Sequence, residues 1–208
     1  MLITVIEGLN GAVETLVSQS YGYGDLHLCG VQFNRGRLIL TTVYIPLAIL
    51  LSFSDTLLIW LGQDDLVVHH ASNYIVMTLP AVYFYSMFDL TKRFLNCMNV
   101  AWVPMTATVI ATILHPFWCY LFVIILGMDI TGIAIAYTIT QSTLIIFVTV
   151  YAACVPEIAD AIHLPDADAL KEWRSYLRLG IPVMIMLWAE DSGFHALTLL
   201  SGLIGVNA

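Results

Sequence analysis

The sequence predicts an all-α fold, a polytopic bundle of about six transmembrane helices. Of its 208 residues, 60% are hydrophobic and only 11% are charged, whereas charged residues make up roughly a quarter of an average soluble domain. The mean hydropathy is +0.87, and several apolar runs reach the roughly 20 residues that a helix needs to cross a bilayer. A lipid bilayer is therefore the expected surroundings of this chain.

The apolar runs define the expected helices in order. Residues 1–17 form a segment at the short end of a span, without the basic n-region and cleavage site of a signal peptide. Gly8, Gly11 and Ala12 indicate close helix packing in this segment. Five full spans are expected to follow, at about 38–61, 66–90, 103–126, 130–153 and 179–204.

One sizeable polar stretch, residues 154–178, lies between the last two spans. Pro156, Pro165 and a run of acidic residues are typical of a linker, and we expect it to contain one short amphipathic helix. It is the candidate domain boundary of the chain.

The basic residues indicate how the helices cross the membrane. If the spans alternate in direction, the segments at about 29–37, 91–99 and 154–178 lie on one side, and the two loops on the other side carry no Lys or Arg. The positive-inside rule makes these three segments cytoplasmic. They contain all seven basic residues: Arg35, Arg37, Lys92, Arg93, Lys171, Arg174 and Arg178.

Composition and spacing also exclude several function classes. With 7 basic and 15 acidic residues, the chain has no nucleic-acid footprint. Its four cysteines have no CxxC spacing, which argues against a zinc site or a disulfide framework. His69 and His70 are adjacent rather than helically spaced, and no nucleophile–base or metal-ligand set is visible. We therefore expect no enzyme, cofactor or metal site. The cysteines are Cys29, Cys97, Cys119 and Cys154.

Three ionisable residues lie near the middle of the last span, where a charge costs about 2.5–3.5 kcal/mol on insertion scales. Asp191 and His195 are four residues apart, so they can hydrogen-bond along one helix face. They are either a structural pair or part of a substrate or proton path. Glu190 is turned about 100° from Asp191 and has no local partner. A lone desolvated carboxyl group can carry a proton through a membrane, so Glu190 is the strongest functional candidate.

Three acidic residues in earlier helices have different expected roles. Asp89 lies three and four residues before Lys92 and Arg93, which favours an ion pair at the membrane edge over a place in the substrate path. Glu14 is expected to be a structural carboxylate that is hydrogen-bonded to nearby loop groups. Glu7, deeper in the same segment, stays an open candidate.

His115 lies close to the centre of the span at 103–126. It is either a neutral histidine bonded to a neighbour's carbonyl, or part of a proton network with the acids of the last span or of a cation site. Phe117, Trp118 and Tyr120 beside it either face lipid or offer their rings to an organic cation.

Four ordered segments resemble the multidrug and toxic compound extrusion (MATE) family of eukaryotic type. They read "GLNGAVETLVSQSYGYGDLHLCG", "LLIWLGQDD", "LPAVYFYSMFDLTKRFLNCM" and "IPVMIMLWAEDSGFHALTLLSGLIG". The matching positions include Gly8, Glu14, Gln19, Tyr21, Gly22, Arg93, Pro182 and Glu190. The chain departs from the family pattern at Asp191 and Ser192, where two aromatic residues are usual, and at His195, which replaces a second acid. Eukaryotic-type members often carry a histidine at the position of His115.

The resemblance implies an architecture of two six-helix lobes, of which this chain would cover helices two to seven. Residues 1–153 would then be helices two to six of the first lobe, 154–178 the cytoplasmic interlobe linker, and 179–208 helix seven. It also implies a secondary active antiporter that exports organic cations or other small amphiphilic drugs and metabolites in exchange for protons. Glu190 would be the proton-coupling acid, Na⁺ is the alternative ion, and a plasma or vacuolar/endomembrane location would be usual. As a partial chain, it would be incomplete for transport.

Two further functions stay open at this point. The chain could be a non-transporting membrane protein or a truncated gene product, in which the polar residues only lock helices together. A related lipid-linked sugar flippase would line its cavity with basic residues, but here every Lys and Arg is expected at the cytoplasmic face.

Overall fold

The computed structural model describes residues 2–60, 65–162 and 166–205. Within these ranges the chain is helical and contains no strand, which confirms the predicted all-α class. The elements are α1 (Leu2–Gly22), α2 (Leu26–Ser52), α3 (Ser54–Trp60), α4 (Asp65–Cys97), α5 (Trp102–Cys119), the π-helical turn η1 (Tyr120–Ile125), α6 (Asp129–Ala153), the 3-10 turns η2 (Pro156–Ala161) and η3 (Ala167–Leu170), and α7 (Trp173–Gly205).

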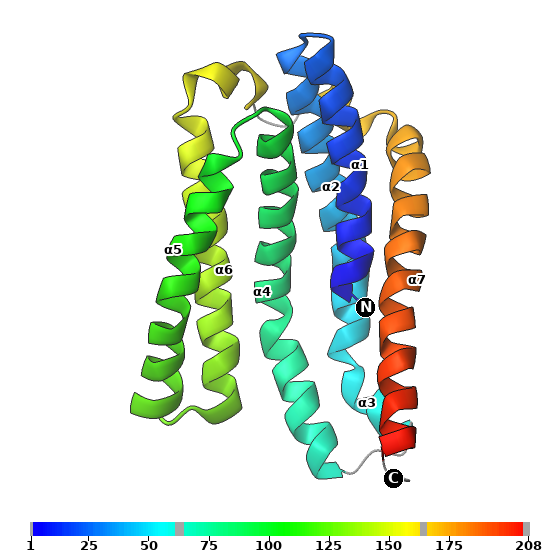
Figure 1. The fold of residues 1–208 in the computed structure, drawn as a ribbon, viewed down its shortest axis with the longest axis vertical. Helices are drawn as coiled ribbons and strands as arrows, with labels where there is room; N and C mark the ends of the chain where they lie inside the picture. The colour runs from blue at the N-terminus through cyan, green and yellow to red at the C-terminus, as the bar shows by residue number, and fades with distance from the viewer. Residues whose placement is uncertain (1, 61–64, 163–165, 206–208) are drawn as a thin grey trace.

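The six long helices alternate in direction along the bundle (Figure 1). The α1–α2 turn, the α4–α5 turn and the linker before α7 all lie at the upper end in this view, whereas α3 and the α5–α6 turn lie at the lower end. The three basic segments of the sequence therefore meet at one end of the bundle. This is the arrangement that the positive-inside rule requires.

Three of the described helical segments are long and apolar enough to cross a membrane by composition alone. They are Leu26–Ser52, Trp102–Ile125 and Asp129–Ala152. The other long helices, α1, α4 and α7, have 21, 33 and 33 residues, and at about 1.5 Å per residue each reaches the thickness of a bilayer's hydrocarbon core.

Helix α2 begins twelve residues earlier than the sequence predicts, at Leu26 instead of 38. Asp25 caps its start, where the carboxylate accepts a hydrogen bond from the Leu28 amide at 2.9 Å. Its first turns bury polar side chains, among them Gln32 and Arg35, between neighbouring helices. A prediction based on apolar runs cannot include these turns, because their polar side chains are buried against protein rather than exposed to water.

The linker also differs from the prediction. Its described residues form two 3-10 turns and no amphipathic helix, and α7 begins at Trp173, six residues before the predicted start at 179. The Trp173 indole donates to the Ala169 carbonyl at 3.1 Å. Arg35 of α2 donates to the Asp168 carbonyl at 3.0 Å and lies 3.8 Å from Glu172. These contacts hold the linker against α2 up to Glu172. Helix α7 therefore begins directly after them, earlier than predicted.

Helix α1 packs against α2, α4 and α7. Its small residues bring α7 very close: a Cβ added to Gly8 would lie 2.3 Å from the Met184 Cα, and one added to Gly11 would lie 3.0 Å from Val183. The Tyr176 hydroxyl of α7 donates to the Leu9 carbonyl at 3.0 Å. The close packing predicted for the glycines of α1 is confirmed.

Candidate functional site

A row of polar side chains runs between α1 and α4, and we call it the polar seam. Four of its residues lie on one face of α1, at spacings of three and four: Glu7, Asn10, Glu14 and Ser18. They face residues of α4 that also lie about one turn apart: Tyr85, Asp89, Arg93 and Cys97. The two helices run in the same direction, so the pairs follow one another up the seam.

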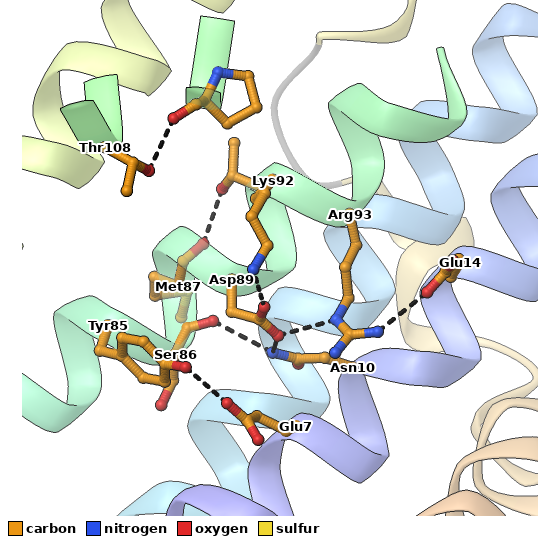
Figure 2. Close-up of polar contacts among 12 residues, drawn as sticks. Glu7, Asn10, Glu14, Tyr85, Ser86, Met87, Asp89, Lys92, Arg93 and Thr108 are labelled. Atoms are coloured by element: carbon orange, nitrogen blue, oxygen red, sulfur yellow. Dashed lines mark hydrogen bonds and ion pairs between the residues drawn. The ribbon is translucent and has the colours of Figure 1, made fainter. Parts of the chain in front are cut away.

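Asp89 is at the centre of the polar seam, and its side chain is only 2% exposed. It lies 2.9 Å from the Lys92 amine and 2.8 Å from the Arg93 Nε, and it accepts a third bond from the Asn10 amide at 3.1 Å (Figure 2). The ion pair predicted from the spacing is present. Asn10 adds a bond across helices that local spacing cannot predict.

Arg93 also contacts a second acid, one turn further along α1. Its Nη1 lies 2.9 Å from the carboxylate of Glu14, whose side chain is 58% exposed. The expectation of loop partners for Glu14 is wrong, because its partner is on α4. Beyond this pair, the Ser18 hydroxyl contacts the Cys97 thiol at 3.2 Å.

Glu7 is at the lower end of the seam, where the Tyr85 hydroxyl donates to its carboxylate at 2.5 Å. The sequence left Glu7 without an assigned partner because Tyr85 is 78 residues away. Tyr85 also lines a pocket on the other side of α4. Glu7 is therefore connected to that pocket through a single hydrogen bond.

The pocket lies between α4, α5 and α6 and has a volume of about 420 Å³. This is within the range of roughly 300–1,000 Å³ that is usual for small-molecule sites. Its walls include Phe88, Thr112, His115, Tyr137 and Gln141. The mixture of aromatic rings, hydroxyls and an imidazole suits an amphiphilic ligand better than a purely apolar one.

His115 is held in the pocket wall by two side chains. Its Nδ1 is 2.9 Å from the Thr140 hydroxyl, and its Nε2 is 3.5 Å from the Cys119 thiol. One of the two interpretations of the sequence gave His115 a neighbour's carbonyl as its partner, and the contacts observed are instead to two side chains. Either neutral tautomer of the imidazole can make both contacts, because a hydroxyl and a thiol can each donate or accept a hydrogen bond.

The pocket and the acids of the last helix are on opposite sides of the bundle. Helix α5 is at one edge and α7 at the other, with α4 and α1 between them (Figure 1). The structure therefore does not bring His115 together with Glu190 and Asp191 in one proton network, as one interpretation of the sequence suggested. Equal depth in a membrane places two residues in one layer, but it does not make them neighbours.

Helix α7 presents its two described acids differently. The Thr4 hydroxyl of α1 donates to the Asp191 carboxylate at 3.0 Å. Glu190 has an exposed side chain and contacts no hydrogen-bond or ion-pair partner among the described residues. The side chain of His195 lies outside what the structure describes, so its predicted pairing with Asp191 stays a prediction.

The remaining motif residues are at helix ends and surfaces. Gln19, Tyr21 and Gly22 form the exposed last turn of α1, where the Gln19 carbonyl accepts a bond from the Tyr23 amide at 3.1 Å. Pro182 lies within α7 and is exposed. None of these residues is among those that line the pocket in the described part of the chain.

Sequence reasoning missed the part of the pocket that α6 supplies. Tyr137, Thr140 and Gln141 lie at spacings of three and four on one face of α6. That polar stripe was a signal that could have identified them. Tyr85 had no comparable signal, since tyrosine is common in membrane helices without lining a site.

Comparison with known proteins agrees with this architecture. A sequence model of the MatE family matches residues 1–121. The chain belongs to the MatE family. Over 96% of its length it superimposes on the crystal structure of the eukaryotic MATE transporter AtDTX14, with a TM-score of 0.87 and 26% identity, and it covers 45% of that chain.

Curated relatives of this MatE chain come from plants and animals. Protein DETOXIFICATION 16 of Arabidopsis thaliana is 28% identical over 197 residues, which are 95% of this chain and 40% of that protein. Multidrug and toxin extrusion protein 1 of Danio rerio is 30% identical over 202 residues, or 97% of this chain and 34% of that protein. The chain thus spans less than half the length of these relatives.

Proposed function

We propose that this MatE chain forms part of a secondary active antiporter that exports organic cations or other small amphiphiles in exchange for protons. The names of the relatives state multidrug and toxin extrusion, and the transport cycle is proposed for a protein of their length that contains these helices. In such a protein, residues 1–153 would belong to one lobe, 154–178 would be the cytoplasmic linker, and 179–208 would begin the second lobe. A plasma-membrane or vacuolar/endomembrane location fits this role.

The pocket between α4, α5 and α6 is the observation that carries the proposal. It is large enough for a drug-sized molecule, and its rings at Phe88 and Tyr137 can take the charge of an organic cation through cation–π contacts. No Lys or Arg lines it, which favours a cationic over an anionic substrate. A lipid-linked sugar flippase would need the opposite charge.

Two acids are placed to couple protons to this cycle. Glu190 is on a face of α7 that no described element covers, so its carboxyl group is free to change partners when a transporter rearranges. Glu7 contacts the pocket wall through Tyr85, so its protonation can respond to what the pocket holds. We assign Glu190 the coupling role and Glu7 a role in the substrate path.

The test is ethidium efflux from liposomes that contain a full-length protein with this segment. A pH gradient should drive efflux in the unchanged protein, and Glu190→Gln should abolish it without lowering the amount of reconstituted protein. Asp55→Asn is the matched control, since Asp55 is an exposed acid of α3 outside the pocket and the seam. A Na⁺ gradient in place of the pH gradient identifies the coupling ion. Normal pH-driven efflux from Glu190→Gln would refute the assignment.

The alternative is a membrane protein in which these polar groups only hold helices together. It fits the polar seam, where Asp89 and Arg93 satisfy each other. It does not explain an amphiphilic pocket of this size, and the family relatives are extrusion proteins. Loss of ethidium binding on changing His115 to Phe, with unchanged thermal stability, would separate a ligand site from structural packing.

A further inference from the structure

A second, smaller cavity lies between α2, α4 and α6, and it shares no lining residue with the first pocket. Its volume is about 230 Å³, which is below the range of roughly 300–1,000 Å³ for drug-sized ligands. The walls are mostly apolar, with Phe33, Met87, Phe94 and Ile145 among them, and Ile162 of the linker also lines it. Such a slot suits part of a hydrocarbon chain.

One cation lines this cavity. The Arg37 guanidinium carbon is 5.5 Å from the centre of the Phe33 ring, and its side chain is exposed. Arg37 has no ion-pair partner among the described residues, whereas Arg35, Lys92 and Arg93 each contact an acid. The guanidinium is therefore free to bind an anion, and the described residues that line the cavity include no acid that would compete for it.

The position of the cavity in the bundle indicates where that anion comes from. Arg37 belongs to α2, one of the helices that can span the membrane. Thr91, near the end of α4, and Ile162 of the linker also line the cavity, so the cavity lies toward the end of the bundle that carries the basic segments (Figure 1). By the positive-inside rule this is the cytoplasmic end, where anionic lipids are concentrated. Basic pockets between membrane helices on that side are typical headgroup sites.

We propose that this cavity binds an anionic phospholipid of the cytoplasmic leaflet. One acyl chain occupies the apolar slot between α2, α4 and α6, and the phosphate pairs with the Arg37 guanidinium, which can form two parallel hydrogen bonds to it. This site goes beyond substrate transport, because it uses neither the first pocket nor the coupling acids.

Native mass spectrometry of the whole chain, delipidated in detergent, tests the proposal. The probes are phosphatidylglycerol, phosphatidylcholine with the same acyl chains, and inorganic phosphate. The unchanged protein should bind phosphatidylglycerol in preference to phosphatidylcholine. Arg37→Gln should weaken phosphatidylglycerol binding about fivefold, as expected for one charge at the membrane surface, and Arg37→Lys should keep most of it. Inorganic phosphate should not compete, because it lacks the chain.

Two further variants separate this site from general charge effects. Arg174→Gln removes another arginine, which has no ion-pair partner in the described part of the chain and lies on α7, away from the cavity. This variant should leave binding unchanged. Thr149→Trp fills the slot from an exposed lining position and should weaken binding of both lipids. The proposal is overturned if Arg37→Gln and Arg174→Gln lose phosphatidylglycerol equally, if Arg37→Gln loses none, or if Thr149→Trp binds normally. Thermal unfolding of each variant confirms that it is folded.

Discussion

At the scale of single residues, burial separates two acids that contact the same arginine. Asp89 and Glu14 lie 2.8 Å and 2.9 Å from Arg93, but their side chains are 2% and 58% exposed. Exposed ion pairs contribute about 0–1 kcal/mol. Breaking a buried pair by removing one partner costs about 3–5 kcal/mol, because the other charge is left uncompensated. Asp89 is therefore the structural acid of the polar seam.

We expect Asp89→Ala to lower the free energy of unfolding by about 3 kcal/mol, the low end of that range, because Lys92 remains 39% exposed and can reach water. Glu14→Ala should cost less than about 1 kcal/mol. Unfolding in detergent, followed by circular dichroism, measures both. Asp55→Ala, a change at an exposed acid, provides the baseline. Equal losses in Asp89→Ala and Glu14→Ala would contradict the importance of burial.

The contacts of these acids also show which side-chain partners can be predicted from the sequence. The contacts of Asp89 with Lys92 and Arg93 follow from spacing along one helix, so the sequence alone predicts them. Glu7, Glu14 and His115 each have a partner on another helix, at separations of 25 to 79 residues. No local pattern in the sequence predicts these contacts, because they depend on how the helices pack against one another.

At the scale of helices, the contact between α1 and α7 depends on the absence of a side chain. A Cβ on Gly8 would meet the backbone of Met184 at 2.3 Å, and backbone cannot move aside as the end of a side chain can. Gly22, at the end of the same helix, has no atom within 4 Å of an added Cβ. The two glycines have the same helix propensity but opposite surroundings.

We expect Gly8→Ala to destabilise the protein by about 1–3 kcal/mol through overpacking. Gly22→Ala should be neutral or slightly stabilising, because alanine is favoured over glycine in helices by up to about 1 kcal/mol. Thermal unfolding in one detergent compares the two variants directly. A stabilised Gly8→Ala variant would show that α7 does not pack on α1 as closely as described here.

Helix existence was predictable, but helix ends were not. Apolar runs identify all six long helices, because the bilayer selects for about 20 apolar residues regardless of neighbours. The apolar runs do not include the first turns of α2 and α7, because polar residues lie at or beside these turns. They are Gln32, Arg35 and Glu172. Arg35 contacts Gln32, the Asp168 carbonyl and Glu172, and these contacts are a property of the assembled bundle.

At the scale of the whole molecule, alternation of the helices assigns each end of the bundle to one side of the membrane. All basic segments gather at the end that also carries the linker, and the opposite end has no Lys or Arg. At roughly 1 kcal/mol per basic residue near an anionic surface, seven such residues favour one orientation strongly over the reverse.

Cys154 makes that orientation measurable. It follows α6 at the basic end and is exposed, so a membrane-impermeant maleimide should label it only in inside-out vesicles. The other three cysteines are replaced by serine to leave one site. Asp55→Cys in a chain without Cys154 is the matched control, because α3 lies at the opposite end of the bundle (Figure 1). It should be labelled only in right-side-out vesicles. Labelling of both positions from the same side would mean that the helices between them do not cross the membrane in the alternating order seen here, and labelling with both sides exchanged would mean that the basic end faces away from the cytoplasm.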